Sequence, residues 1–212
     1  MRAHLWSPCA VFLAGALLAG CTPISLQMAI KQNDLNAVKE FVEGGSSLAS
    51  LGSFKRTPLI AAAYYQSPAI VEYLLTREVD VNAQDTKGAT ALTYSAFYGD
   101  KRSAELLVQA KAALDVKDKK GCTALMYAAY YGHLSLAELL VQAKAALEVK
   151  DKKGYTALMY AAYYGHLPIV RLLINQGADT KVTDSKGIDL LNLAAQAKQN
   201  AVVEYLEKVK SE

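Results

Sequence analysis

Two histidines in this 212-residue chain could take part in catalysis or bind a metal ion. His133 and His166 occupy the same place in two similar, successive stretches of the sequence. If those stretches stack like packed helices, the rings lie roughly 10 Å apart, whereas the His ligands of a zinc ion lie about 2 Å from it. One metal ion could therefore not bind both rings. We expect a structural role for each His, with a ligand or a general base as the alternative.

The acidic and thiol side chains also lack a catalytic arrangement. Asp118 and Asp151 recur at the same turn, where Asp commonly bonds the backbone. Cys122 has no nearby His in the sequence, and Ala89 and Tyr155 replace it in the neighbouring copies. There is no glycine-rich phosphate loop and no zinc-ligand spacing. The sequence therefore predicts no enzyme, cofactor or metal site, and it places Cys122 at a variable surface position.

Pairs of aromatic residues are the more informative feature. A helix cannot point two consecutive residues the same way, so at least one ring of each pair should be exposed. Tyr suits a binding surface because it offers a large amphipathic area with few rotatable bonds. The alternative is a ladder of rings that pack on one another, since aromatics at helical spacing most often serve packing. The pairs are Tyr64 and Tyr65, Phe97 and Tyr98, Tyr130 and Tyr131, and Tyr163 and Tyr164.

Lysines recur in the turns that precede these pairs. They could steer an acidic partner toward the protein and speed its association, or they could be solvated charges that maintain solubility. The net charge of the chain is only +3 at pH 7, so nucleic acid is not implied as a partner. The candidate lysines are Lys119, Lys120, Lys152 and Lys153, with Lys87 and Lys186 on the same rim. Cys122 and Tyr155, which follow these lysines, complete the candidate partner-binding surface.

The elements that must position these side chains repeat along the chain. The stretch Lys117–Leu134 returns at Lys150–Leu167 with one change, Cys122 to Tyr155. Fainter copies begin one period before and one period after these two. The period is 33 residues, which also separates Gly88, Gly121, Gly154 and Gly187 from one another. A fixed period of this length is the signature of a solenoid, in which each unit packs on its neighbours.

The repeated motif resembles that of ankyrin-repeat proteins. The resemblance implies an all-α solenoid of about six stacked helix-turn-helix units with projecting β-hairpin loops. It also implies that the motif His bonds a loop, and that the aromatic pairs and the hairpin tips line a concave, partner-binding groove. The matching residues are Asp118, Gly121, Thr123-Ala124-Leu125-Met126, Ala128-Ala129 and Gly132-His133. The expected ankyrin-repeat domain is 24–212, with units at about 24–51, 52–84, 85–117, 118–150, 151–183 and 184–212.

Residue types predict where the helices of each unit begin and end. Thr123 should cap the first helix of its unit, and Gly132 should end that helix in a left-handed turn. The Gly that ends the second helix is kept at Gly177 but replaced by Lys111 and Lys144. A Lys with a positive φ there costs about 1 kcal/mol relative to Gly.

The ends of the array depart from the repeated pattern. Ser25–Gly45 predicts a first helix pair without a hairpin, as suits a terminal cap. Lys55 stands where later units have Gly, which predicts a distorted hairpin. Gln196–Lys198 replace the aromatics in the last unit, which also suits a polar cap.

The first twenty residues predict a targeting segment. An apolar run at 10–19 follows a basic start and is too short to span a bilayer as a helix. Leu18-Ala19-Gly20-Cys21 resembles a bacterial lipobox, which implies that residues 1–20 are removed, that Cys21 carries lipid and that residues 21–23 are a short tether. The alternative is a plain secretory signal. The lipobox resemblance also implies the outer membrane, with the domain facing the periplasm, because lipoproteins that stay in the inner membrane tend to have Asp where this chain has Thr22.

A second form of the protein is a further hypothesis. Initiation at Met28 would give a cytosolic domain without the anchor, and the alternative is an ordinary buried Met.

Bacterial ankyrin lipoproteins resemble immunity partners of secreted antibacterial toxins, including phospholipases. The resulting hypothesis is a monomer, anchored through Cys21, that binds and neutralises one toxin. Its partner, a toxin or an envelope enzyme, would have an acidic surface. The alternative is a periplasmic scaffold or a chaperone-like stress-protection factor for an envelope enzyme. An adjacent toxin gene would favour the first hypothesis, and an adjacent stress-enzyme gene the second.

Overall fold

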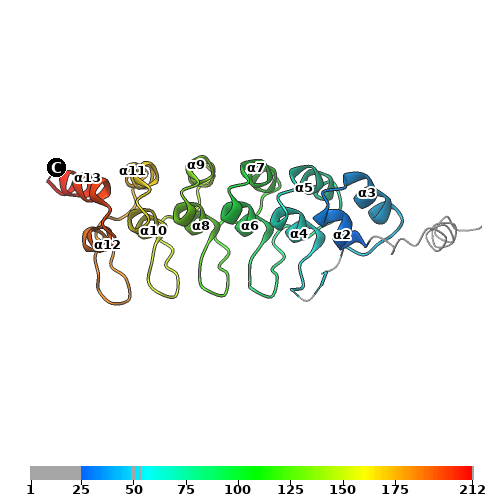
Figure 1. Cartoon of the computed structure of the whole chain (residues 1–212), viewed down its shortest axis with the longest axis horizontal. Helices are drawn as coiled ribbons and strands as arrows, with labels where there is room; N and C mark the ends of the chain where they lie inside the picture. The colour runs from blue at the N-terminus through cyan, green and yellow to red at the C-terminus, as the bar shows by residue number, and fades with distance from the viewer. Residues whose placement is uncertain (1–24, 49–50, 53, 212) are drawn as a thin grey trace, which may run out of the picture.

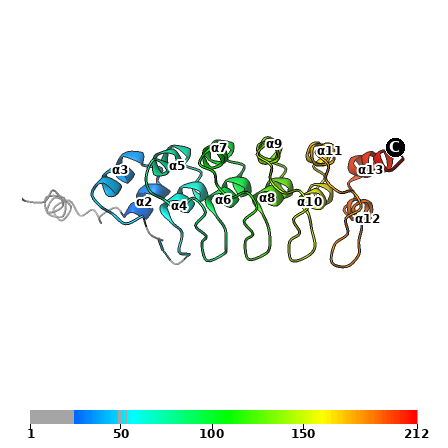
Figure 2. The same cartoon turned by 180° about the vertical axis from the view of Figure 1, so that it is seen from behind.

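Helix pairs follow one another in a single array. The computed structural model describes residues 25–48, 51–52 and 54–211. Figure 1 shows the two helices of each pair in two parallel rows, with loops projecting beyond one row. Figure 2 shows the same rows from behind. The predicted all-α solenoid is confirmed.

The described residues form twelve helices that alternate between a row next to the loops, the inner row, and an outer row. The inner row consists of α2 (Leu26–Lys31), α4 (Pro58–Tyr64), α6 (Ala91–Tyr98), α8 (Ala124–Tyr131), α10 (Ala157–Tyr163) and α12 (Leu190–Gln196). The outer row consists of α3 (Leu35–Glu43), α5 (Pro68–Leu75), α7 (Lys101–Gln109), α9 (Leu134–Gln142), α11 (Leu167–Asn175) and α13 (Asn200–Ser211). Each expected unit thus contains one inner and one outer helix.

Each inner helix begins after a residue whose side-chain oxygen accepts a hydrogen bond from a backbone N–H of the first turn. Thr123 accepts this bond from Met126 at 3.5 Å, as predicted. In the last unit Asp189 replaces Thr and accepts the bond from Asn192 at 2.8 Å. Such a cap typically contributes about 1 kcal/mol. The recurring cap therefore fixes where each inner helix starts.

The core runs through the whole array between the two rows. Ala128 and Ala129 of α8 are fully buried, and their small size lets neighbouring inner helices approach closely. Leu125 on the same helix and Leu136 and Leu140 of α9 fill the space between the rows. Each unit is thus buried by the units beside it, as expected for a solenoid.

Left-handed residues end the helices, and two of them are lysines. Gly132 ends α8 with φ 77°, as predicted. Lys111 and Lys144, which follow α7 and α9, have φ 60° and 70°, and Gly177 has φ 90° after α11. The two lysines therefore keep the left-handed conformation of the Gly that they replace, in which Lys costs about 1 kcal/mol more than Gly.

The second unit contains a further lysine of this kind. Lys55 has φ 49°, the left-handed conformation that Gly88 adopts at the equivalent place in the next unit with φ 74°. Lys55 therefore takes the backbone conformation of the Gly that it replaces. The hairpin of this unit still departs from the next ones, because Gly52 stands where they have Asp and Leu51 forms a bridge with Arg56.

The projecting loops are stacked turns, and the described residues form no strands within them. Two isolated bridges, Leu51–Arg56 and Thr183–Asp189, are the only strand-like pairs there. In the third loop Asp118 Oδ1 accepts hydrogen bonds from the backbone N–H groups of Lys120 and Cys122. Since the Asp side chain binds N–H groups that a longer ladder would use, the predicted β-hairpins are corrected to side-chain-bonded turns.

The first helix pair, predicted for Ser25–Gly45, is confirmed as α2 and α3. Met28 is 43% exposed on α2, so its interpretation as a buried Met is wrong. The reason is that α2 is the first helix of its row, with no helix of the described chain before it. The predicted signal segment at 1–20, the lipidated Cys21 and the tether at 21–23 lie outside the described residues. None of the helices in the described part is long and apolar enough to span a bilayer.

The positive φ values give a test of the turn geometry. Lys111→Gly and Lys144→Gly should each leave the free energy of unfolding unchanged or raise it by up to about 1 kcal/mol, because Gly carries no Cβ strain at positive φ. The reverse change, Gly177→Lys, should lower it by a similar amount, since a Cβ there meets no atom within 4 Å and only backbone strain is added. Urea unfolding followed by circular dichroism measures all three. A clear loss of stability in both glycine variants would contradict the left-handed geometry.

Candidate functional site

A groove lies between the inner helices and the projecting loops. It consists of two hollows, of about 620 and 520 Å³, which share Phe97, Lys119, Lys120 and Tyr127 as lining residues. Every predicted partner-binding residue except Tyr65 lines one of the two hollows. The structure therefore brings residues from several units onto one continuous surface, which we call the groove.

The paired aromatic rings pack along the groove from unit to unit. The first ring of each pair contacts the second ring of the following pair. The ring centroids are 5.6 Å apart for Tyr64 and Tyr98, 4.7 Å for Phe97 and Tyr131, and 4.3 Å for Tyr130 and Tyr164. The packed ladder, which the sequence left as an alternative, is thus present.

Among the paired rings, the exposed ones are confined to the later units. Tyr131, Tyr163 and Tyr164 are 41%, 37% and 39% exposed. These three rings form both a packed ladder and an accessible surface. Aromatic rings held by their neighbours lose little entropy when a partner covers them.

The first two pairs have no exposed ring, so the prediction of one in every pair is wrong there. Tyr64 is covered by the guanidinium of Arg56, whose Cζ lies 3.7 Å from the ring centroid. Phe97 is only partly covered, by Tyr127 and Tyr131 with ring centroids 5.6 and 4.7 Å away, and it still lines both hollows.

A third set of tyrosines, which the sequence analysis missed, forms the floor of the groove. The Tyr127 hydroxyl donates a hydrogen bond to Asp118 Oδ2 at 2.6 Å, and Tyr160 donates to Asp151 Oδ2 at 2.7 Å. The other oxygen of each Asp accepts backbone N–H groups of its own turn. Each carboxylate therefore ties a loop to the inner helix that follows it. An Asp and a Tyr at the same separation in successive units are the sequence signal that could have revealed this set.

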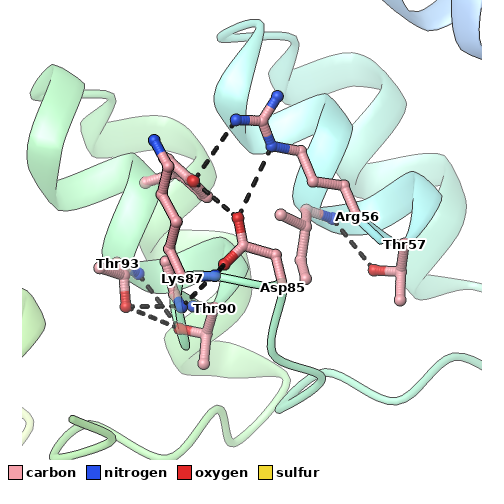
Figure 3. A network of polar contacts seen from close by, with 9 residues as sticks. Arg56, Thr57, Asp85, Lys87, Thr90 and Thr93 are labelled. Carbon is pink, nitrogen blue, oxygen red and sulfur yellow. Dashed lines mark hydrogen bonds and ion pairs between the residues drawn. The ribbon is translucent and has the colours of Figure 1, made fainter. Parts of the chain in front are cut away.

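The first Asp–Tyr pair carries an additional cation. Tyr94 donates to Asp85 Oδ2 at 2.7 Å, and Arg56 Nε lies 3.7 Å from the same oxygen. Figure 3 shows Arg56 and Asp85 pointing toward each other. Burial, followed by the hydrogen bond to Asp85, raises the pKa of Tyr94 to about 12. The same causes raise the pKa of Tyr127 and Tyr160, so these hydroxyls remain donors at neutral pH.

Cys122 is buried, with 5% exposure, so its predicted surface position is wrong. Its Sγ lies 4.0 Å from Asp151 Oδ2 and 3.9 Å from the Tyr160 hydroxyl. The physical reason is that Cys122, like Arg56 two units earlier, precedes a cap and faces the Asp–Tyr pair of the next unit. Burial raises the pKa of the thiol to about 11, so Cys122 is no thiolate at neutral pH. Its counterpart Tyr155 is half-buried and packs against Tyr160, with ring centroids 5.3 Å apart.

The two histidines join adjacent units. Nε2 of His133 lies 3.3 Å from the carbonyl oxygen of Phe97, and Nε2 of His166 lies 3.1 Å from that of Tyr130. A carbonyl only accepts hydrogen bonds, so Nε2 is the donor in both. The expected structural role is confirmed, although the partner is a helix of the preceding unit and not a loop. Over the described residues, no group of three or more His, Cys, Asp or Glu side chains could hold a metal ion.

Lysines form the rim of the groove. Lys119, Lys120, Lys152 and Lys153 are exposed and line it. The turns that carry them are joined, since Lys119 N donates to the carbonyl of Lys87 at 2.9 Å and Lys152 N to that of Lys120 at 3.1 Å. Their positive charges are therefore carried on turns that are bonded to one another. Lys186 lies outside both hollows.

The repeated units match a known family of proteins. The family model described as ankyrin repeats (3 copies) matches residues 26–118, 70–151, 97–184 and 125–211. Together these overlapping matches span nearly all of the described array. A search of curated proteins gave no match.

The Asp–Tyr bonds can be tested through stability. Tyr127→Phe should lower the free energy of unfolding by about 1.5–3 kcal/mol, because it removes a donor from a charged acceptor, Asp118. Tyr163→Phe removes a hydroxyl from an exposed ring and should change stability by less than about 0.5 kcal/mol. Urea unfolding measures both. Equal effects of the two changes would show that the Asp–Tyr bond does not hold the loop to the helix.

Proposed function

Because the chain belongs to the ankyrin-repeat family, we propose that it is a protein-binding module whose partner docks in the groove. The observation that carries this proposal is the continuity of the two hollows, which join the aromatic ladder to the lysine rim. Tyr is enriched at the centres of protein interfaces, where a few aromatic anchors supply most of the binding energy. Tyr131, Tyr163 and Tyr164 are the exposed anchors of this groove.

The rim indicates the charge of the partner. Lys119, Lys120, Lys152 and Lys153 form no ion pair within the described part of the chain. Their charges are therefore available to attract an acidic surface, which raises the rate of association more than the final affinity. An acidic protein is the partner that this rim favours.

We further propose that the partner is a secreted antibacterial toxin, with phospholipases as the candidate class, and that binding neutralises it. Support comes from the resemblance to toxin-immunity lipoproteins, which is an analogy at the level of the fold. Residues 106–121 and 139–154 are also nearly identical, as a recent duplication would leave them. Such a duplication would lengthen the groove by one whole unit.

An anchor at Cys21 would place the first unit of the array close to a membrane. Only residues 22–24 separate Cys21 from Ser25, the cap of α2, an extended reach of roughly 10–14 Å. A lipid-attacking toxin would meet the array at that surface. We therefore propose an outer-membrane lipoprotein that faces the periplasm.

The anchor can be tested independently of the partner. Cys21→Ser should leave a soluble or unprocessed protein, because the lipobox-like sequence would then lack the thiol that takes the lipid. Fractionation of cells labelled with palmitate measures the change, with Cys122→Ser as the control that keeps its label. Label persisting on the Cys21 variant would rule out lipidation at this residue.

The groove can be tested with the protein encoded beside this chain's gene. The triple change Tyr131→Ala, Tyr163→Ala and Tyr164→Ala should weaken binding by at least about 2 kcal/mol and abolish protection of cells that export the toxin. Glu138 and Glu204 are exposed on the outer helices α9 and α13. The double change Glu138→Ala with Glu204→Ala should therefore leave both the affinity and the protection unchanged.

Calorimetry, a growth assay and circular dichroism, which monitors folding, measure these effects. A folded triple variant that binds as tightly as the wild type would contradict docking in the groove. Binding to a stress-protection enzyme without any protection against a toxin would instead favour the scaffold hypothesis.

A further inference from the structure

Three consecutive units contain the same frame of two aromatic rings and one carboxylate. In the first frame Tyr94 packs against Tyr64 with ring centroids 5.2 Å apart and donates to Asp85 at 2.7 Å. The later two frames keep the hydroxyl–carboxylate bond, at 2.6 and 2.7 Å. Their ring centroids are 5.6 Å apart, and their rings are tilted by 57° where those of the first frame are nearly perpendicular at 86°. Their members are Phe97, Asp118 and Tyr127 in the second frame, and Tyr130, Asp151 and Tyr160 in the third.

The chain fills the first frame with its own arginine. The Arg56 guanidinium stacks on Tyr64 at 3.7 Å, lies 3.7 Å from Asp85 Oδ2, and donates to the Tyr94 hydroxyl at 3.5 Å. The side chain of Arg56 is only 12% exposed. Figure 3 shows it reaching across from its own unit toward Asp85 in the next. The frame therefore holds a guanidinium by stacking, by charge and by a hydrogen bond.

The second frame lacks this arginine. Ala89 takes the place of Arg56, and among the described residues Asp118 forms no ion pair. Ala89, Phe97, Asp118 and Tyr127 all line the 520 Å³ hollow. The second frame thus has aromatic rings and a carboxylate like those of the first frame, but they border a hollow instead of an arginine side chain.

The third frame is partly filled. Cys122 occupies the position of Arg56 and lies within 4.0 Å of the Asp151 carboxylate. A buried thiol there leaves less room than Ala89 leaves in the second frame. The third frame also borders a hollow, the one of about 620 Å³, but only in the second frame does a single methyl group, that of Ala89, stand in the place of Arg56. The second frame is therefore the better candidate for a ligand that resembles the Arg56 side chain.

We propose that the second frame binds an arginine side chain of the protein partner. Its guanidinium stacks on Phe97, pairs with Asp118 and bonds the Tyr127 hydroxyl, as Arg56 does one unit earlier. Arginine suits the frame better than lysine, because a planar guanidinium stacks on a ring and donates in several directions at once. Lys119 and Lys120 line the same hollow, so the arginine should be flanked by acidic residues. This inference rests on the proposed function and specifies what the partner presents.

One test of the frame needs no partner. Ala89→Arg places a guanidinium where Arg56 places its own, and it should raise the melting temperature of the full chain by about 2–4 °C relative to Ala89→Gln. Gln is the matched control because it adds a polar side chain without the cation. Equal or lower stability of the Arg variant would overturn the proposal, because the frame would then not accept a guanidinium.

A second test uses a fluorescein-labelled peptide with one arginine between two pairs of glutamates, and the same peptide with citrulline in its place. The full chain should bind the arginine peptide at least tenfold more tightly in fluorescence anisotropy. Both Ala89→Arg, which fills the frame, and Asp118→Asn, which removes its charge, should abolish this preference. Ala89→Ser, which leaves the frame unfilled, should keep the preference for the arginine peptide.

The outcomes separate this inference from the proposed function. Equal binding of both peptides, weakened equally by Lys119→Glu with Lys120→Glu, would overturn the arginine site and leave an acidic-segment groove standing. No binding of either peptide would overturn the arginine site as well, while the toxin-binding assay would still decide the function of the groove.

Discussion

The hydrogen bond between a tyrosine of an inner helix and an aspartate of the preceding loop is the interaction on which the groove depends. In the central unit Asp118 binds the backbone of its own turn with one oxygen and the Tyr127 hydroxyl with the other. Without either bond, Asp118 would no longer connect the turn to the helix. The rim lysines would then lose their fixed position relative to the aromatic ladder. The groove is therefore a product of buried polar contacts as much as of helix packing, and such contacts are strongest when every member is satisfied.

Three successive units differ in the residue that precedes the cap of the inner helix. In these units that residue adjoins the Asp–Tyr pair of the next unit, so one substitution changes the groove without changing the fold. Arg56 forms an ion pair with Asp85, and Ala89 leaves the Asp118 carboxylate beside a hollow. Cys122 places a buried thiol against Asp151. A solenoid can diversify in this way because each unit contacts only its neighbours, so a local change is not transmitted through one central core.

The sequence predicted the features that depend on local chemistry and on periodicity. The cap at Thr123 and the left-handed end of the same helix at Gly132 follow from residue type and position alone. The burial of Cys122 could not be predicted in the same way, since it depends on the side chain that the next unit presents. Tyr127 was missed because its partner, Asp118, lies outside the helix, where helical periodicity carries no signal.

The central claim is that the groove, and not the outer row, receives the partner. Photocrosslinking in the native cell tests it most directly, with benzoylphenylalanine in place of Tyr163 in the groove or of Glu138 on the outer helix α9, both of which are exposed. The account predicts one discrete adduct from the groove position, absent when Tyr131 and Tyr164 are replaced by Ala, and none from α9. An adduct from α9 with none from the groove would contradict it.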